Sequence, residues 1–221
     1  MIPKGYEKRS SDFHLNKLHV QFGCGSCAPK GWLNFDSSPT LRFERIPIIG
    51  SLYTRNSQRW PANVRYGDIV KGLPISQSSC SGIYSSHVLE HLALQECEVA
   101  LQHAFSYLEP GGTFRCLVPD LRAQIDAYLA DSPDVAALRF MEYTGLGRKT
   151  RERGVRGFVK EWFGNSHHLW LWDERSLTDA MKAAGFKHVR RAKFNDSEDR
   201  RFIEVESLER FDYALALECI K

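Results

Sequence analysis

The sequence predicts an α/β domain in which helices cover a mostly parallel β-sheet. Three observations support that fold class. An apolar strand over residues 18–22 ends at a glycine turn, and a second strand over 33–36 ends in Asp36. Further along, strands over 82–86 and 113–118 flank a stretch with helical spacing of its apolar residues. Strands that alternate with helices in this way form mostly parallel sheets.

The remaining elements follow from hydrophobic periodicity and from residues that end regular structure. Pro110 and the two glycines after it end a helix, and Gly185 is placed to cap another. The predicted helices span 87–108, 121–143 with a break near Ser132-Pro133, and 174–184. The further predicted strands span 63–66, 187–194 and 213–220. Residues 37–61 show no regular pattern.

The link between the first two strands is short. Residues 26–31 include Pro29, which argues against a full helix. A parallel crossover normally takes a dozen or more residues. If the two strands are parallel neighbours, their connection must therefore be a loop or a single turn.

Composition limits the class of protein. A chain of 221 residues can bury a sizeable core, so a single domain over 1–221 is expected. The net charge of +3 does not demand a polyanionic partner. The chain has no apolar run long enough for a membrane span, and residues 1–12 lack an apolar signal core. A cytoplasmic location is expected.

The six cysteines are scattered, which is typical of reduced thiols in a cytosolic protein. Cys24 and Cys27 form a CxxC pair, but no second pair completes a zinc site. We therefore interpret both as turn residues beside a ligand.

Five motifs occur in a fixed order at workable spacing. They are Val20-Gln21-Phe22-Gly23-Cys24-Gly25, Asn34-Phe35-Asp36, Gly67-Asp68-Ile69, Ser85-Ser86-His87-Val88-Leu89-Glu90-His91-Leu92 and Leu108-Glu109-Pro110-Gly111-Gly112-Thr113-Phe114. On these motifs the sequence resembles class I S-adenosylmethionine-dependent methyltransferases of the methyltransferase type 11-like group. The short link and the Gly-Trp before the second strand resemble a bacterial subgroup associated with surface-polysaccharide genes.

This resemblance covers roughly residues 18–120, and Ala183-Ala184-Gly185-Phe186 with the final strand extends it. It implies a Rossmann-like, doubly wound and mostly parallel sheet whose last strand is antiparallel. It also implies S-adenosylmethionine as the cofactor, S-adenosylhomocysteine as its product, and no metal.

The resemblance places Gly23, Cys24 and Gly25 under the methionine part of the cofactor and Asp36 at the ribose hydroxyls. Glycine permits close approach of the main chain, and a carboxylate accepts hydrogen bonds from hydroxyl groups. Taken alone, Asp36 is typical of a turn that ends a strand. The glycine turn upstream favours ribose binding. Gln21 stands where many members of the family carry an acid.

The next two motifs supply the adenine and methyl ends of the predicted site. The resemblance makes Asp68 the acceptor for the adenine amino group, with Ile69 packed on the ring. Ser86 and His87 would line the cofactor near the transferable methyl group. The alternative for Asp68 is a purely structural role as a turn or helix-capping residue.

The stretch His87-Val88-Leu89-Glu90-His91 has a second interpretation. It matches the H-x-x-E-H pattern of inverted zinc peptidases, in which two histidines bind zinc and the glutamate is the base. A third ligand would have to come from an acid downstream, such as Glu161 or Glu174. Because the methyltransferase family carries a similar pattern at this place, we favour no metal, with His91 a helix residue beneath the cofactor.

Beyond residue 120 the sequence predicts a substrate cap, an insertion at about 121–172. Its basic residues are Arg148, Lys149, Arg151, Arg153, Arg156 and Lys160, followed by Phe158, Trp162, Phe163, His167, His168, Trp170 and Trp172. Arginine forks bind phosphate and carboxylate, which favours an anionic acceptor. The alternative is a solvated basic loop beside an aromatic core segment.

These features predict methyl transfer to an oxygen or nitrogen of a small-molecule or carbohydrate-like acceptor. His87 and His168 are the candidate catalytic residues, because imidazole accepts protons near neutral pH. An RNA methyltransferase is an alternative, since the basic aromatic stretch suits a splayed nucleotide. The strand over 82–86 disfavours a nucleic-acid acceptor, because it does not lead into the Asn/Asp-Pro-Pro-aromatic motif of enzymes that methylate nucleic-acid amino groups. A non-catalytic nucleotide-binding or partner protein on the same fold is the other alternative.

Overall fold

The computed structural model describes residues 17–48, 50, 58–147, 149–150 and 167–221. Its strands are β1 (Leu18–Phe22), β2 (Trp32–Asp36), β3 (Val64–Tyr66), β4 (Cys80–Ser86), β5 (Leu108–Pro119), β6 (Lys187–Arg191) and β7 (Ala214–Ile220). Its α-helices are α1 (Pro39–Glu44), α3 (Leu94–Tyr107), α4 (Leu121–Ala130), α5 (Pro133–Tyr143) and α7 (Glu174–Ala183). Short 3₁₀ helices are η1 (Leu89–His91), η2 (Arg200–Glu204) and η3 (Leu208–Phe211).

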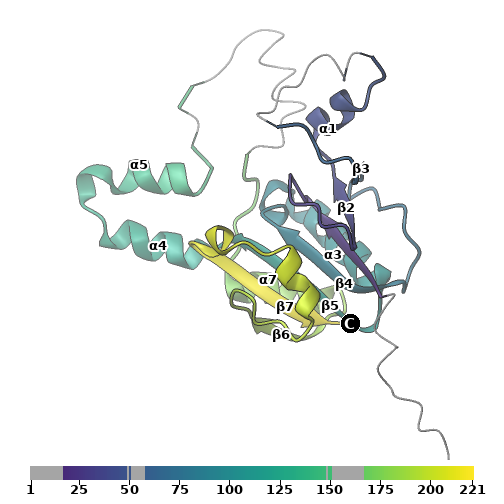
Figure 1. Ribbon diagram of the computed structural model, residues 1–221. Coiled ribbons are helices and arrows are strands. Elements are labelled where there is room, and N and C mark those ends of the chain that lie inside the picture. Colours follow the sequence, from purple (N-terminus) through teal and green to yellow (C-terminus); the bar gives the residue numbers. More distant parts are fainter. Residues whose placement is uncertain (1–16, 49, 51–57, 148, 151–166) are drawn as a thin grey trace, which may run out of the picture.

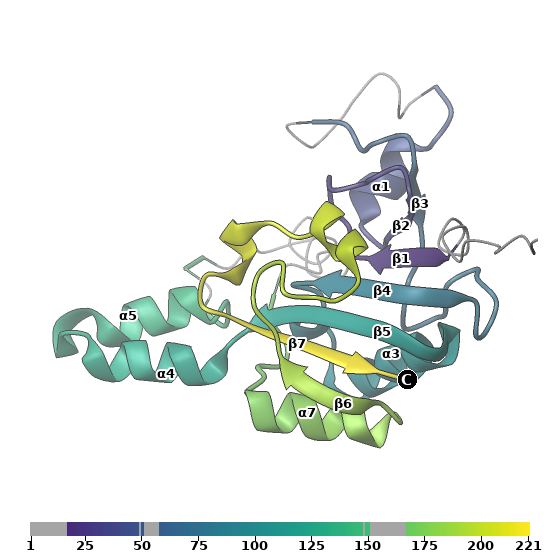
Figure 2. The same ribbon diagram turned by 60° about the horizontal axis from the view of Figure 1, so that its bottom comes forward.

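The strands form one seven-stranded sheet in the order β3-β2-β1-β4-β5-β7-β6. β1 pairs in parallel with β2 and β4, whereas β7 runs antiparallel to both β5 and β6. Figure 2 shows the arrowheads of β1 and β4 pointing toward the side where α4 and α5 project. The strand order reverses between β1 and β4, which is where open α/β sheets bind ligands. The predicted doubly wound, mostly parallel sheet with an antiparallel last strand is confirmed.

β1 and β2 are parallel neighbours although no helix of the structure lies between them. The buried side chain of Gln21 holds the connecting loop, because its Nε2 donates to the Cys27 carbonyl at 2.7 Å and to Asn34 Oδ1 at 2.6 Å. The two strands thus join through a loop, one of the two forms that the short link allows.

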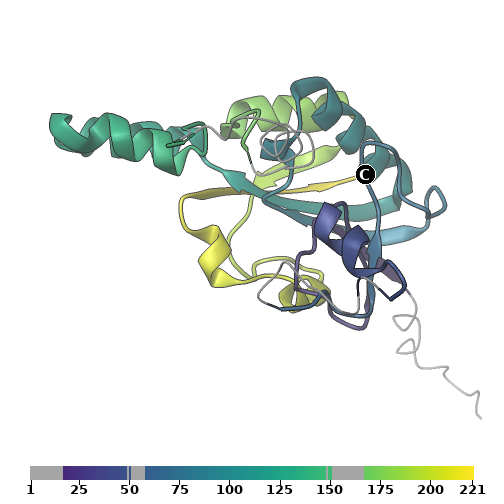
Figure 3. The same cartoon turned by 90° about the horizontal axis from the view of Figure 1, so that it is seen from above.

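Different elements cover the two faces of the sheet. On one face α3 and α7 bury the main core, with Leu101 and Leu177 packed in the same cluster as Phe114 from β5. On the other face Phe202 of η2 packs with Trp32 and with side chains of β4, β5 and β7. Figure 3 shows α3 and α7 on one side and the yellow segment between β6 and β7 on the other. This β6–β7 segment (residues 192–213) therefore covers the face of the sheet opposite α3 and α7.

Three predicted elements have other bounds in the structure. The strand predicted over 113–118 begins at Leu108, so Pro110 and the two glycines after it lie within β5. The helix predicted over 87–108 begins only at Leu94, because His87 has a φ of 55° and η1 forms a tight 3₁₀ turn. The strand predicted over 187–194 ends at Arg191. The left-handed turn at His87 turns the chain sharply where β4 ends, and no apolar pattern encodes such a turn.

The predicted break near Ser132-Pro133 separates α4 from α5. Pro133 occupies the first turn of α5, where its missing N–H is harmless. Asp120 caps α4 through a hydrogen bond from the Arg122 N–H at 3.0 Å. The two helices form a hairpin that projects away from the sheet (Figure 1). In the described part of the chain no helix has the length and apolar character to cross a membrane.

Candidate active site

The glycine turn after β1 is shaped by two left-handed residues, Gly23 with φ 67° and Gly25 with φ 55°. A Cβ on Gly23 would lie 2.0 Å from Val88 Cγ2, so glycine is required there for η1 to approach β1. At Gly25 the nearest atom to such a Cβ is Arg210 Nη2 at 4.0 Å. Open space for a ligand is therefore found next to Gly25, whereas the side chain of Val88 fills the space next to Gly23.

Cys24 turns its side chain away from that space. The thiol lies in a small cluster with Leu41 and Val64, and burial, helped by the charge of Asp36, raises the pKa of Cys24 to about 12. Cys24 and Cys27 are both free thiols, and the Cys27 Sγ lies 3.9 Å from the Val205 carbonyl. Only the backbone of Cys24 is left to face a ligand.

Asp36 ends β2 with 8% of its surface exposed. Its Oδ2 accepts from the Gly25 N–H at 3.0 Å and its Oδ1 accepts from the Ser38 N–H at 2.8 Å. Burial raises the pKa of Asp36 although these two hydrogen bonds oppose that shift. The carboxylate closes both turns, and each oxygen keeps a lone pair for a further donor.

Asp68 follows β3 and lies beside this edge, because the Gly67 N–H donates to the Asp36 carbonyl at 3.1 Å. Asp68 Oδ1 accepts from the Val70 N–H at 3.0 Å, and Oδ2 pairs with Lys71 Nζ at 3.1 Å. Asp68 is thus also a turn residue, and Ile69 lies in the main core at 5% exposure.

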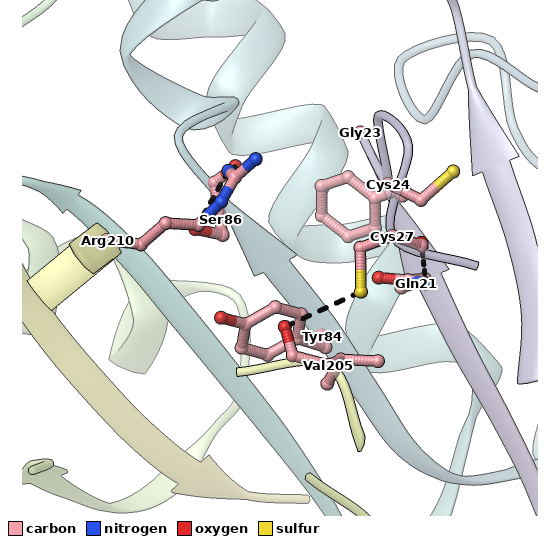
Figure 4. A pocket seen from close by; sticks show the side chains of 9 residues that line it. Gln21, Gly23, Cys24, Cys27, Tyr84, Ser86, Val205 and Arg210 are labelled. Atoms are coloured by element: carbon pink, nitrogen blue, oxygen red, sulfur yellow. Dashed lines mark hydrogen bonds between the residues drawn. The ribbon is translucent and has the colours of Figure 1, made fainter. Parts of the chain in front are cut away.

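Ser86 ends β4 and meets Arg210, a residue that the sequence argument did not identify. Arg210 Nη1 lies 3.4 Å from both the carbonyl and the Oγ of Ser86. Both line a small cavity of about 10 Å³, shown in Figure 4 and here named the turn cavity. Its other lining residues are Gln21, Phe22, Gly23, Cys24, Cys27, Tyr84 and Val205. No local motif marks Arg210, since it lies more than 120 residues after Ser86.

Both ring nitrogens of His87 face oxygen atoms. Nδ1 lies 3.2 Å from Glu90 Oε1, and Nε2 lies 3.1 Å from the Arg210 carbonyl. Burial opposes the charged ring, but the hydrogen bond and charge of Glu90 outweigh it and raise the pKa of His87. Since a carbonyl accepts and a carboxylate accepts, this ring is held as a donor of two hydrogen bonds.

His168 is held differently. Its Nδ1 donates to the Thr144 carbonyl at 2.7 Å, which leaves Nε2 with a lone pair. Burial lowers the pKa of His168, so the ring is neutral near pH 7. The two candidate catalytic histidines share one cavity of about 530 Å³, here named the hairpin cavity. The other residues that line it are Pro119, Gln124, Ala127, Ala130, Asp131, Arg139, Tyr143, Asp212 and Tyr213.

Among the described residues, Glu90, His91 and His168 bring potential metal ligands within 4.8 Å of one another. Glu174, one acid considered from sequence, pairs instead with Arg191 at 3.0 Å. The other, Glu161, lies outside the described residues, as do Arg148, Arg151, Arg153, Arg156, Lys160, Phe158, Trp162 and Phe163 of the predicted cap. Within the described part, Trp172 is buried in the main core and Lys149 pairs with Glu142.

The sheet order, the antiparallel β7 and the glycine turn at the point of reversal define a class I S-adenosylmethionine-dependent methyltransferase. The chain belongs to the methyltransferase domain family, whose sequence pattern it matches over residues 22–191.

Solved structures show the same fold. The chain is similar to a Thermotoga maritima S-adenosylmethionine-dependent methyltransferase described as a possible histamine N-methyltransferase, with 15% identity and a TM-score of 0.51. That match covers 95% of this chain and 84% of the other. PigF, solved with S-adenosylhomocysteine, matches with 15% identity and a TM-score of 0.50 over 96% of this chain and 52% of its own. No curated protein sequence matches the chain.

Proposed function

We propose that this methyltransferase modifies an oxygen or nitrogen of a small or carbohydrate-like acceptor bound in the hairpin cavity. The observation that carries the proposal is the position of His87. It directly follows Ser86 of the turn cavity and also lines the hairpin cavity. A volume of about 530 Å³ is within the range of small-molecule sites. Consecutive residues thus line the two cavities, and we propose that the methyl group passes between ligands at this point.

The residues around the turn cavity carry chemical groups that suit the cofactor, but the cavity of about 10 Å³ is the size of one water molecule and must widen to admit it. A nearly buried carboxylate with free lone pairs at Asp36 suits ribose hydroxyls, and Gly25 leaves the main chain open to a ligand. Arg210 offers a positive charge to the amino-acid end of the cofactor. Asp68 and Ile69 stay our candidates for the adenine. When bound, S-adenosylmethionine supplies an activated methyl group and leaves as S-adenosylhomocysteine.

His168 is the better candidate for accepting a proton from the acceptor. Its neutral Nε2 has a lone pair, whereas both nitrogens of His87 already face oxygen acceptors. We propose that His87 positions the acceptor and holds Arg210 near the site. His168 Nε2 would receive the proton that the acceptor loses.

The α4–α5 hairpin forms the described part of the proposed substrate cap, since it supplies Gln124, Ala127 and Tyr143 to the cavity wall. Its lining cation, Arg139, pairs with Asp131 Oδ1 at 2.6 Å. That pairing neutralises the charge and gives no support to binding a phosphate backbone, so we favour a small acceptor over RNA. An anionic acceptor stays a prediction, because most of the basic residues that suggest it lie outside the described ranges.

The compartment and the subgroup are proposals as well. All six cysteines are free and five of them are buried, which fits a reducing compartment such as the cytoplasm. The proposed link to surface polysaccharides rests on the short β1–β2 connection and on Gly31-Trp32.

The first test measures cofactor binding by titration calorimetry with S-adenosylhomocysteine. We expect binding in the micromolar range and a higher melting temperature, because a ligand that binds the native state stabilises it. Absence of binding by either S-adenosylmethionine or its product at millimolar concentration would overturn the proposal.

The second test locates the acceptor. Methyl-labelled S-adenosylmethionine is incubated with the enzyme and a size-filtered extract of small molecules, and transfer of label is followed. Ala127→Trp places bulk in the hairpin cavity and should abolish transfer while S-adenosylhomocysteine affinity stays unchanged. Ala137→Trp on the exposed side of α5 is the matched control. Equal transfer by both variants would remove the acceptor from this cavity.

A further inference from the structure

A buried carboxylate next to the hairpin cavity lacks a partner for one of its oxygens. Glu90 in η1 has no exposed surface. Its Oε1 accepts from His87 Nδ1 at 3.2 Å, but Oε2 has no hydrogen-bond partner among the described residues. A buried carboxylate oxygen without a partner is costly, so its retention calls for a ligand that satisfies it.

Two histidine rings are held with a free nitrogen each. His91 Nδ1 donates to the His167 carbonyl at 3.0 Å, and His168 Nδ1 donates to the Thr144 carbonyl at 2.7 Å. Since carbonyl oxygens only accept, both rings carry their proton on Nδ1 and keep the lone pair on Nε2. Histidines that bind metals are oriented by such hydrogen bonds to backbone carbonyls.

The three side chains converge without bonding to one another. The two rings meet edge to face with their centres 4.9 Å apart, and one donor atom from each residue lies within 4.8 Å of the others. No hydrogen bond joins Glu90 to either ring within the described ranges. Two N–H groups, of Leu169 at 2.7 Å and of Trp170 at 3.2 Å, donate to the Glu90 carbonyl and fix the His168 segment against η1.

We propose that Glu90, His91 and His168 bind one divalent first-row transition-metal ion such as Zn²⁺ or Mn²⁺. Two imidazoles and one carboxylate suit ions of this class and leave coordination positions open. Metal–ligand distances of about 2.0–2.2 Å hold ligand atoms within about 4.2 Å, so small side-chain shifts complete the site. The sequence alone favours no metal because the methyltransferase family carries a similar pattern at this place, whereas the fold adds His168 to Glu90 and His91.

The inference rests on the proposed function for its role in catalysis. His168 lines the hairpin cavity, so an open position on the ion would face an acceptor there. An oxygen bound to a divalent cation loses its proton more easily, which assists attack on the methyl group. His168 would then act through the ion, and the proton of the bound acceptor oxygen would pass to water as the oxygen–methyl bond forms and the sulfonium–methyl bond breaks.

The experiment uses the tag-free, full-length protein stripped with a chelator and dialysed against Zn²⁺ or Mn²⁺ in separate samples. We expect about one ion per chain by elemental analysis and a higher melting temperature, because the ion joins η1 to the segment around His168. His91→Ala, His168→Gln and Glu90→Gln should each weaken binding at least about tenfold. His103→Ala is the matched control, since its Nδ1 also meets a backbone carbonyl, that of Ile69 at 2.7 Å.

Less than about one-tenth of an ion per chain in the wild-type protein, or equal binding by the three site variants and the control, would overturn the inference. S-adenosylhomocysteine binding is measured on the same samples. Cofactor binding without metal binding would contradict only this inference. Metal binding without cofactor binding would contradict only the proposed function.

Discussion

The proposed cofactor edge and the proposed acceptor side of this molecule are built in different ways. At the proposed cofactor edge, Gly25 follows β1 and Asp36 ends the neighbouring strand β2, and the Gly25 N–H donates to Asp36 Oδ2 at 3.0 Å. On the acceptor side, His87 and His168 line one cavity although about 80 residues separate them. The first region is local and mostly backbone, and the second depends on side chains brought together by the complete fold. Substitutions should therefore separate cofactor binding from turnover.

The sharpest test of that separation is His168→Ala. We expect a loss in kcat of about 10²–10⁴-fold, the usual range for removing a residue that assists proton transfer, with S-adenosylhomocysteine affinity unchanged. Methyl transfer to the identified acceptor and calorimetry give the two quantities. His103→Ala is the control of the same residue type. A parallel loss of cofactor affinity would contradict the division into two regions.

The β6–β7 segment touches both regions, because Arg210 reaches Ser86 and Asp212 lines the hairpin cavity. Arg115 on β5 holds the β6–β7 segment through an ion pair with Glu206. The side chains of both residues are fully buried. Arg115→Met leaves that carboxylate without its cation, and we expect a loss of about 3–5 kcal/mol in the free energy of unfolding. Chemical denaturation followed by circular dichroism measures it.

The control for that anchor is Arg190→Met, whose side chain is 41% exposed beside Glu218. Exposed ion pairs contribute little, so we expect less than about 1 kcal/mol. If the two variants lose the same stability, burial does not set the strength of this anchor.

Asp36→Ala tests the cofactor edge. The loss of a carboxylate that accepts hydrogen bonds should weaken S-adenosylhomocysteine binding by about 1–3 kcal/mol. Part of the effect arises because the Gly25 N–H loses its acceptor. Asp179→Ala on the exposed side of α7 is the matched control. Unchanged affinity would leave Asp36 as a residue that only shapes the turn.

The smallest effect concerns Asp196, which supports the same segment. Burial opposes its ionisation, but hydrogen bonds from Arg190, Lys193 and Arg115 outweigh burial and lower the pKa of Asp196 from 3.8 to about 2. Its stabilisation is therefore complete above about pH 4 and is lost as the pH falls from about 4 to about 2. Because the carboxylate is partly exposed, we expect less than about 1 kcal/mol.

Melting temperatures of the wild-type protein and of Asp196→Asn should therefore differ at pH 5 and converge as the pH falls to about 2. A difference that stays constant over this range would show that the charge of Asp196 does not stabilise the fold.

The backbone at the proposed cofactor edge could be predicted from the sequence because its signals are local. The strand at 18–22, the glycine turn and the loop link to β2 are all encoded within a few residues of one another. The same holds for the division of 121–143 into two helices at Pro133. Each of these features depends on backbone preference or on a short hydrophobic period, which the local sequence determines.

The acceptor side could not be predicted in the same detail. The H-x-x-E-H pattern draws attention to Glu90 and His91, but only the folded chain brings His168 to them. Arg210 lies in a segment without a motif and reaches Ser86 through long-range packing. The left-handed backbone at His87 also shortens a helix that apolar spacing extends too far. Long-range packing and unusual backbone angles leave little trace in a single sequence.

The position of β7 has a consequence for how the protein forms during synthesis. β7 lies between β5 and β6, although it follows both in the chain, and Leu215, Leu217 and Cys219 on it are fully buried. While the ribosome has not yet released residues 214–220, β5 exposes an unpaired edge and β6 has no neighbour. Unpaired strand edges on nascent chains invite association with other chains. The sheet is therefore closed only once β7 has emerged after β5 and β6, and until then those two strands present unpaired edges to other chains.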